Sequence, residues 1–304
     1  MRTITALYCK RVRVVVADPP AYTPWYDHEL AAALARAGAE VEMATTRFRF
    51  GEVPAPAGYT RTERFYPLSS RVPGRSRARL PLRAAEHLGV LAFTVGDLDS
   101  AQEHLERALA GAEELGFQLP LGDVLGYLAL VALERGDLDA ARARAERASG
   151  IAREADLNLL VAYAGLVNGQ VSIATGDLDG AEVAFESAMK TFADVGQTGQ
   201  EAECRAGLAR VALARGDVDG AVSLVEPLLP RLDSDGLSGA IRVGEVLVTC
   251  WDVLSAAGDP RAPGVLATAR AYLDARVALI DDDAMRAAFL STPAVARLLN
   301  GNVG

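Results

Sequence analysis

The sequence predicts a mostly α-helical protein, an α-solenoid of paired helices with a period of 40 residues, preceded by a small α/β fragment. Nearly the same six letters recur as GDLDSA, GDLDAA, GDLDGA and GDVDGA, beginning at residues 96, 136, 176 and 216, and a weaker copy begins at Gly258. The stretches between these copies have the three-and-four spacing of apolar residues that is typical of a helix. A fixed period of this length is the signature of stacked repeats, so these helices should form one extended array.

The first part of the chain predicts a parallel strand–helix–strand unit of the Rossmann-like kind. Residues 12–17 (VRVVVA) predict a buried strand, and residues 40–45 (EVEMAT) predict a second strand. Between them, residues 27–37 predict a helix, with Asp27 as its N-cap and Gly38 as its end. A strand, a helix and a strand within about 35 residues form a βαβ unit with a right-handed crossover.

A linker should separate this fragment from the helices. Residues 61–83 hold seven arginines together with Pro67, Pro73 and Pro81. This composition favours a flexible, solvated linker, although an arginine-rich stretch could also bind an anionic surface. The predicted organisation is therefore a βαβ fragment over 1–60, a linker over 61–83 and a helical repeat domain over 84–300.

The second repeat shows how each unit is built. Residues 121–135 are apolar on one helical face, and Gly136 ends this helix because glycine reaches positive φ without a steric penalty. Either Asp137 or Asp139 can cap the next helix by accepting from its free N–H groups. That second helix should run over about 138–155, so that each unit is a helix, a Gly-Asp turn and a helix.

The tail predicts further helices. Three apolar-periodic stretches are broken by Gly258, Pro260 and Pro293, and they cover residues 241–256, 263–280 and 284–299. They predict a fifth pair followed by a cap that covers the open end of the stack.

The repeats resemble the tetratricopeptide (TPR) family over about 84–235. Twelve residues before the turn alanines, the family's small residue is present as Gly89, Ala129, Gly169 and Ala209. Seven residues after the turn alanines, the pattern is met by Ala108, Ala148 and Ala188, but not by Leu228. The common period of the family is 34, so each unit here carries six extra residues, which we assign to longer helices.

The TPR resemblance implies a groove that is lined by the first helix of each pair and holds a peptide or a partner domain. On that face the pattern places five candidate partner-binding residues, with Arg83 and Asp123 on or near it: Tyr127, Tyr163, Gln170, Glu203 and Arg210. Tyrosine and arginine supply much of the energy of typical interfaces. The leading hypothesis is a non-enzymatic interaction module, which could act in bacterial signalling or transcription regulation.

The charge distribution indicates the kind of partner. Residues 1–87 hold 14 basic and 8 acidic side chains, whereas residues 88–304 hold 17 basic and 32 acidic ones. An acidic array argues against nucleic acid as its ligand, since phosphate binding needs the opposite sign. A basic or amphipathic peptide fits better, and the oligomeric state is left open.

Two further resemblances give alternative functions. Residues 12–83 resemble the start of the N-terminal domain of GT-B glycosyltransferases, which would make the chain a truncated or fused relative of these enzymes. The family's double glycine is replaced by Ala21 and Tyr22. The tail resembles the C-terminal repeat arms of bacterial signalling ATPases and cyclase-linked regulators, which implies a ligand-sensing arm.

The residues suggest no catalytic, cofactor or metal site of their own. The glycosyltransferase-like spacing Glu-x7-Glu occurs twice, at Glu106/Glu114 and Glu146/Glu154, and fits a solvated repeat surface. The paired aspartates of the turns fit helix capping better than calcium binding. Phosphate loops and catalytic motifs are absent, and Cys9, Cys204 and Cys250 lack zinc spacing. No apolar run approaches the roughly 18 residues of a membrane span, so we expect a cytoplasmic protein.

Overall fold

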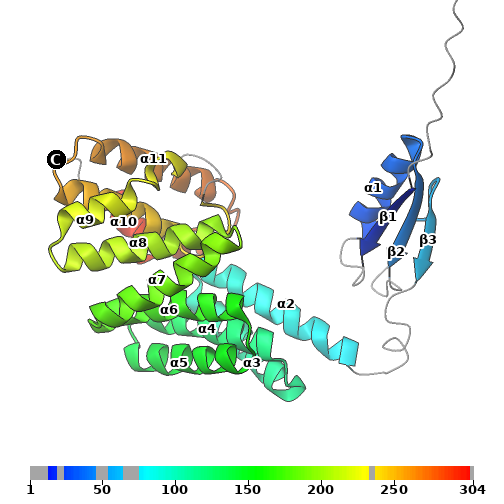
Figure 1. The fold of residues 1–304 in the computed structure, drawn as a ribbon, viewed down its shortest axis with the longest axis horizontal. Helices are drawn as coiled ribbons and strands as arrows, with labels where there is room; N and C mark the ends of the chain where they lie inside the picture. Colours follow the sequence, from blue (N-terminus) through cyan, green and yellow to red (C-terminus); the bar gives the residue numbers. More distant parts are fainter. Residues whose placement is uncertain (1–12, 19–23, 46–53, 64–74, 233–236, 302–304) are drawn as a thin grey trace, which may run out of the picture. The chain divides into compact units, whose positions relative to one another are not determined.

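The chain forms two compact units, residues 1–77 and 78–304, which we describe separately (Figure 1). The computed structural model describes residues 13–18, 24–45, 54–63, 75–232 and 237–301. The predictions for Cys9, Ala21 and Tyr22 lie outside these residues.

The first unit contains the predicted strand–helix–strand arrangement and one strand more. Its elements are β1 (Arg13–Asp18), α1 (Pro24–Arg36), β2 (Glu40–Thr45) and β3 (Thr60–Glu63). The sheet order is β1-β2-β3 and both neighbouring pairs are parallel. The predicted parallel pairing is confirmed, because Arg13 lies opposite Glu40 and Asp18 opposite Thr45.

Two details of this unit differ from the prediction. Helix α1 begins at Pro24, so Asp27 lies inside the helix and is not its N-cap. The fixed φ of proline suits the first helical turn, which moves the start of the helix forward. Strand β1 is buried on one face only, since Val14 and Val16 pack into the core of this unit while Val15 is 64% exposed.

The stretch predicted as a linker is partly structured. Strand β3 extends to Glu63, and the long helix α2 (Arg75–Thr94) already begins at Arg75. The alanines and leucines after Arg77 have a high helix propensity. Their propensity outweighs the unfavourable effect of Pro81, which lies within α2.

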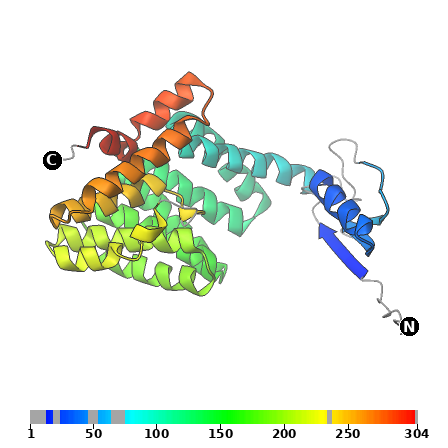
Figure 2. The same cartoon turned by 90° about the horizontal axis from the view of Figure 1, so that it is seen from above.

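The second unit is an α-solenoid of antiparallel helix pairs, as the 40-residue period predicts (Figures 1 and 2). After α2, the helices of the repeats are α3 (Leu98–Leu115), α4 (Gln118–Glu134), α5 (Leu138–Glu154), α6 (Asn158–Thr175), α7 (Leu178–Asp194), α8 (Thr198–Ala214) and α9 (Val218–Val225). The tail adds α10 (Val243–Ala256), α11 (Ala262–Val277), α12 (Asp283–Ser291) and α13 (Pro293–Asn300).

The Gly-Asp turns act as the sequence suggests. All five turn glycines have positive φ, namely Gly96, Gly136, Gly176, Gly216 and Gly258. In the first four turns the first aspartate caps the following helix: Asp97, Asp137, Asp177 and Asp217 each accept from the backbone N–H three residues later. The structure thus decides between Asp137 and Asp139 in favour of Asp137.

The second aspartate of a turn has a different role in two of the units. Asp99 accepts a hydrogen bond from Arg135 at 2.5 Å, and Asp179 accepts one from Arg215 at the same distance. Each arginine belongs to the next pair, so these ion pairs connect neighbouring repeats.

Small residues let the helices of a pair approach closely. A methyl group added to Gly169 on α6, or to Gly207 on α8, would lie within 2.6 Å of the buried ring of Phe185 on α7. The first helices also contact one another in succession, α4 on α6, α6 on α8 and α8 on α10. They form a continuous layer, which we call the first-helix layer.

The fourth pair is incomplete, and this changes the path of the chain. Helix α9 ends at Val225, shortly before Pro227, and a single 3-10 turn (Leu229–Arg231) follows. Proline lacks the N–H that would continue the helix. The chain then returns through residues 237–242, which form no α-helix before α10 begins.

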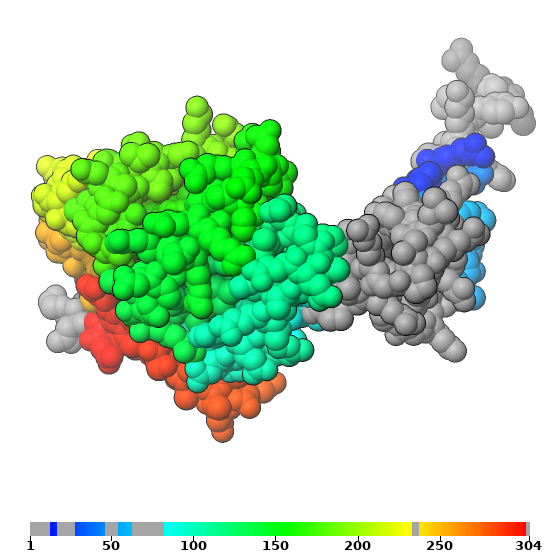
Figure 3. Space-filling model, turned by 90° about the horizontal axis from the view of Figure 1, so that it is seen from below, coloured from blue at the N-terminus to red at the C-terminus, as the bar shows by residue number. Residues whose placement is uncertain are grey.

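The tail reaches the first repeat. Helix α13 contacts α10 and α11, as expected for a cap. A methyl group on Gly96, in the first turn, would lie 2.6 Å from Thr292 Cγ2 and 2.8 Å from the Ala288 carbonyl oxygen. In Figure 3 the orange and red C-terminal helices accordingly lie against the cyan-green first repeat.

Candidate functional site

The first-helix layer carries all five residues that the sequence predicts for the groove. Tyr127 lies on α4, Tyr163 and Gln170 lie on α6, and Glu203 and Arg210 lie on α8. Gln170 and Glu203 are buried, while the tyrosines and Arg210 are half-buried. Their surroundings divide them into two groups.

Gln170, Glu203 and Arg210 surround Arg242 of the same chain. The Arg242 guanidinium donates to Gln170 Oε1 at 3.2 Å, to Glu245 at 3.3 Å and to Glu134, and the Arg242 backbone N–H donates to Glu203. The Arg242 side chain is only 11% exposed. Arg242 thus joins α4, α6, α8 and α10, and the chain itself fills this end of the layer.

Arg210 completes the same network. It donates to Gln170 Oε1 at 3.0 Å and pairs with Glu245 at 3.4 Å. Burial raises the pKa of Glu203 to about 7, although the backbone N–H and charge of Arg242 lower it. Glu203 is therefore largely protonated at mildly acidic pH.

The backbone before Arg242 is held as closely as its side chain. The Gly239 carbonyl accepts a hydrogen bond from Gln200 at 2.6 Å, and Ile241 packs against two of the buried clusters. Gly199 has no side chain at the point where residues 238–240 cross α8, and a methyl group there would overlap their backbone. The segment 238–242 occupies this part of the layer as an internal strap.

The other end of the layer is acidic and aromatic. Glu86 on α2 is buried and pairs with Arg83 at 2.9 Å, and both Asp123 and Tyr127 of α4 lie near it. Burial, with the charge of Glu86, raises the pKa of Asp123 to about 6. Burial and the charges of Glu203 and Asp123 raise the pKa of Tyr127. We call Glu86, Asp123, Tyr127 and Tyr163 the acidic patch.

The tyrosines of the acidic patch are held in place by neighbours. The Tyr127 ring packs edge-on against Phe93 with 5.9 Å between ring centroids. The Tyr163 hydroxyl donates to Gln197 at 2.9 Å and accepts from Gln200 at 3.1 Å. Among the described residues, no group donates a hydrogen bond to the side-chain carboxylate of Asp123. Asp123 is the carboxylate of the patch that can accept one from a ligand.

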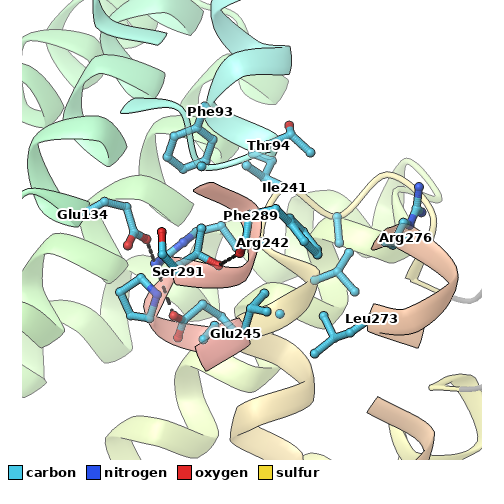
Figure 4. Close-up of a pocket in the computed structure, with 18 of the residues that line it drawn as sticks. Phe93, Thr94, Glu134, Ile241, Arg242, Glu245, Leu273, Arg276, Phe289 and Ser291 are labelled. Atoms are coloured by element: carbon cyan, nitrogen blue, oxygen red, sulfur yellow. Dashed lines mark hydrogen bonds and ion pairs between the residues drawn. The ribbon is translucent and has the colours of Figure 1, made fainter. Parts of the chain in front are cut away.

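A cavity of about 420 Å³ opens beside the strap (Figure 4). The first repeat contributes Phe93, the strap contributes Ile241 and Arg242, and the tail contributes Leu273 and Phe289. Sequence reasoning missed both the strap and this cavity. The signal that could have revealed the strap is the loss of helical spacing between the prolines of the fourth pair and α10.

Comparison with known protein families finds matches in two parts of the helical array. Residues 81–154 and residues 202–227 match family models described as tetratricopeptide repeat. Two parts of the helical array, residues 81–154 and 202–227, are tetratricopeptide repeats. The matched TPR residues lie in the second unit, and the resemblance of 12–83 to glycosyltransferases stays a prediction.

Solved structures resemble the TPR array at low sequence identity. BtubC (BKLC) from P. vanneervenii is 21% identical with a TM-score of 0.48, covering 66% of this chain and 90% of BtubC. TPR-like repeats of Podosopora anserina, named for the kinesin light chain, are 18% identical with a TM-score of 0.45, covering 66% of this chain and 96% of that chain. A variant of the same repeats is 18% identical with a TM-score of 0.47, covering 65% of this chain and 96% of the variant. No curated protein matches the chain.

The remaining candidate residues lie on the TPR surface. Glu106, Glu114, Glu146 and Glu154 are all exposed on the second helices. Within the described ranges, no group of three or more metal-ligating side chains comes together. The described helices include none with the length and apolar character that crossing a membrane requires.

Proposed function

We propose that this TPR protein is an interaction module that binds a basic or amphipathic peptide, or a partner segment of that kind, at the acidic patch. TPR arrays bind proteins and peptides, and the coarse role of an interaction module follows from the repeats themselves. The observation that carries the finer proposal is Asp123, a half-buried residue near Tyr127 and Tyr163 whose carboxylate receives no hydrogen bond from any described group.

The chemistry of the patch fits a cationic side chain. Asp123 offers a charge-assisted hydrogen bond, which is about twice as strong as a neutral one. The faces of the Tyr127 and Tyr163 rings can attract the cationic group of an arginine or lysine. We leave Gln170, Glu203 and Arg210 out of the proposed site, because these residues already contact Arg242 or its network.

The proposal is tested with a labelled amphipathic basic peptide and an acidic peptide of the same length, by fluorescence anisotropy. We expect saturable binding of the basic peptide only, weakened at least about tenfold, or 1.4 kcal/mol, by Asp123→Asn. Glu106→Gln, on an exposed second helix, is the matched control and should bind normally.

The pH dependence adds an independent readout. Because the pKa of Asp123 is raised to about 6, its charge is lost as the pH falls through 6, and peptide binding should weaken between pH 7 and pH 5. Equal binding of both peptides, or a wild-type affinity in Asp123→Asn, would exclude the acidic patch as the site.

A further inference from the structure

The cavity beside the strap has the construction of a small-molecule site, which is separate from the acidic patch. Its volume of about 420 Å³ lies within the ~300–1,000 Å³ typical of ligand pockets. Three parts of the array that are distant in sequence form its wall: the first turn, the strap and the tail. Figure 4 shows Phe93, Ile241 and Phe289 from these three parts around it.

The walls of the cavity are mainly apolar. Phe93 and Leu98 come from the first repeat, Ile241 from the strap, and Leu273 and Phe289 from the tail. The hydroxyls at its edge are already used, since Ser291 donates to the Ala288 carbonyl at 2.8 Å and Thr94 donates to the Val90 carbonyl at 2.8 Å. An apolar ligand body is the part that these walls can bury favourably.

The charged side chains in the lining indicate which head group a ligand of this cavity would carry. The two carboxylates in the lining, Glu134 and Glu245, are both paired with Arg242, and Glu245 pairs with Arg210 as well. Arg276 also lines the cavity, and among the described residues no carboxylate lies within ion-pair distance of it. The cationic group that stays available to a ligand is therefore Arg276.

The Arg276 guanidinium is oriented by its neighbour. Its Nε donates to the Tyr272 hydroxyl at 3.1 Å, and its Cζ lies 5.2 Å from the centroid of the Tyr272 ring. Because only Nε donates to Tyr272, the terminal N–H groups of the Arg276 guanidinium can donate to a planar anion such as a carboxylate. We propose that the cavity binds a small amphipathic anion, with its apolar body between Phe93 and Phe289 and its carboxylate or similar head group on Arg276.

Such a ligand would connect the first repeat to the tail. A ligand that binds only the folded chain stabilises it according to its concentration relative to Kd. Since this ligand contacts both ends of the array, hydrogen exchange should slow at the first turn and in α12 together.

The experiment uses the full chain with dodecanoate below its micelle concentration, and a dodecyl quaternary ammonium ion as a probe of equal length and opposite charge. Calorimetry should show one dodecanoate per chain, with the cation at least tenfold weaker. Arg276→Gln should weaken dodecanoate at least tenfold, and Arg142→Gln, an exposed arginine on α5, should not.

A second variant tests the apolar wall. Phe289→Trp reduces the space and should weaken dodecanoate binding, provided that its thermal melt stays cooperative; if it does not, Leu98→Phe replaces it as the second wall variant. Absence of dodecanoate binding, equal binding of the cation, or unchanged affinity in Arg276→Gln would each overturn the proposal. Binding of the basic peptide at the acidic patch should be unaffected by Arg276→Gln, so the two proposals fail separately.

Discussion

Replacing Arg242 by alanine tests the role of the strap most directly. The Arg242 side chain is 11% exposed and faces Glu134 and Glu245, which are 16% and 21% exposed. Removing the side chain leaves Glu134 without its cation, whereas Glu245 keeps its pairing with Arg210 and Glu203 keeps the backbone N–H of residue 242. Loss of one partner from a buried ion pair typically costs about 3–5 kcal/mol, a large part of the ~5–15 kcal/mol that stabilises most domains.

Urea denaturation followed by far-UV circular dichroism measures this cost. Arg215→Ala is the matched control, because Arg215 pairs with Asp179 and Glu182, whose side chains are 95% and 41% exposed. An exposed pair contributes about 0–1 kcal/mol, so the control should unfold near the wild-type midpoint.

Two further variants separate charge from geometry. Arg242→Lys keeps the charge but loses the planar fork that reaches Gln170 and Glu134 together, so its stability should lie between those of the wild type and Arg242→Ala. Adding Glu134→Ala to Arg242→Ala should recover part of the loss, since one uncompensated carboxylate is removed. If Arg242→Ala cost no more than Arg215→Ala, the strap would not be a stabilising element.

Three other predictions concern pH, packing and independence of the units. The folded-state pKa of Glu203 is raised to about 7, so the folded chain binds more protons than the unfolded chain above pH 4.5 and loses stability as the pH rises towards 7. Glu203→Gln should therefore gain about 1.4 kcal/mol or more relative to wild type at pH 8 compared with pH 5, and equal gains would refute this. Gly169→Leu should cost ~1–3 kcal/mol by overpacking against Phe185, whereas Gly150→Leu, with open space around it, should be near neutral in a thermal melt. Deleting residues 1–77 should leave a cooperative melt of the helical unit, and aggregation of the truncated chain would contradict it.

The sequence predicts the periodic part of this fold well, because the same residue types recur at equivalent positions of four repeats. The Gly-Asp turns, the close contact of Gly169 between two helices and the paired helices all follow from the repeat pattern and are confirmed. A second periodic series was missed: Gly116, Asp156 and Gly196 also have positive φ, in the turns between pairs. This series is hard to recognise in the sequence, because its middle member is an aspartate. Asp156 shares the positive φ of Gly116 and Gly196 but not their residue type.

The site could be predicted only in part. The resemblance to the TPR family places Tyr127, Gln170 and Glu203 on the groove-lining helices, and the structure places them in the first-helix layer. The position of Arg242 could not be derived in this way, because it lies 108 residues from Glu134 in a segment outside the repeat pattern. A contact that occurs only once between distant residues leaves no recurring pattern in the sequence, so the repeats give no means of predicting it.

The contact between the tail and the first turn limits how this array can evolve. Open TPR arrays lengthen by duplication of a unit, since each repeat needs only its neighbours. Here Gly96 lies against Ala288 and Thr292, so an inserted pair would move the tail away from the first turn. This contact therefore ties the number of repeats between the first turn and the tail to one geometry, which an open array does not do.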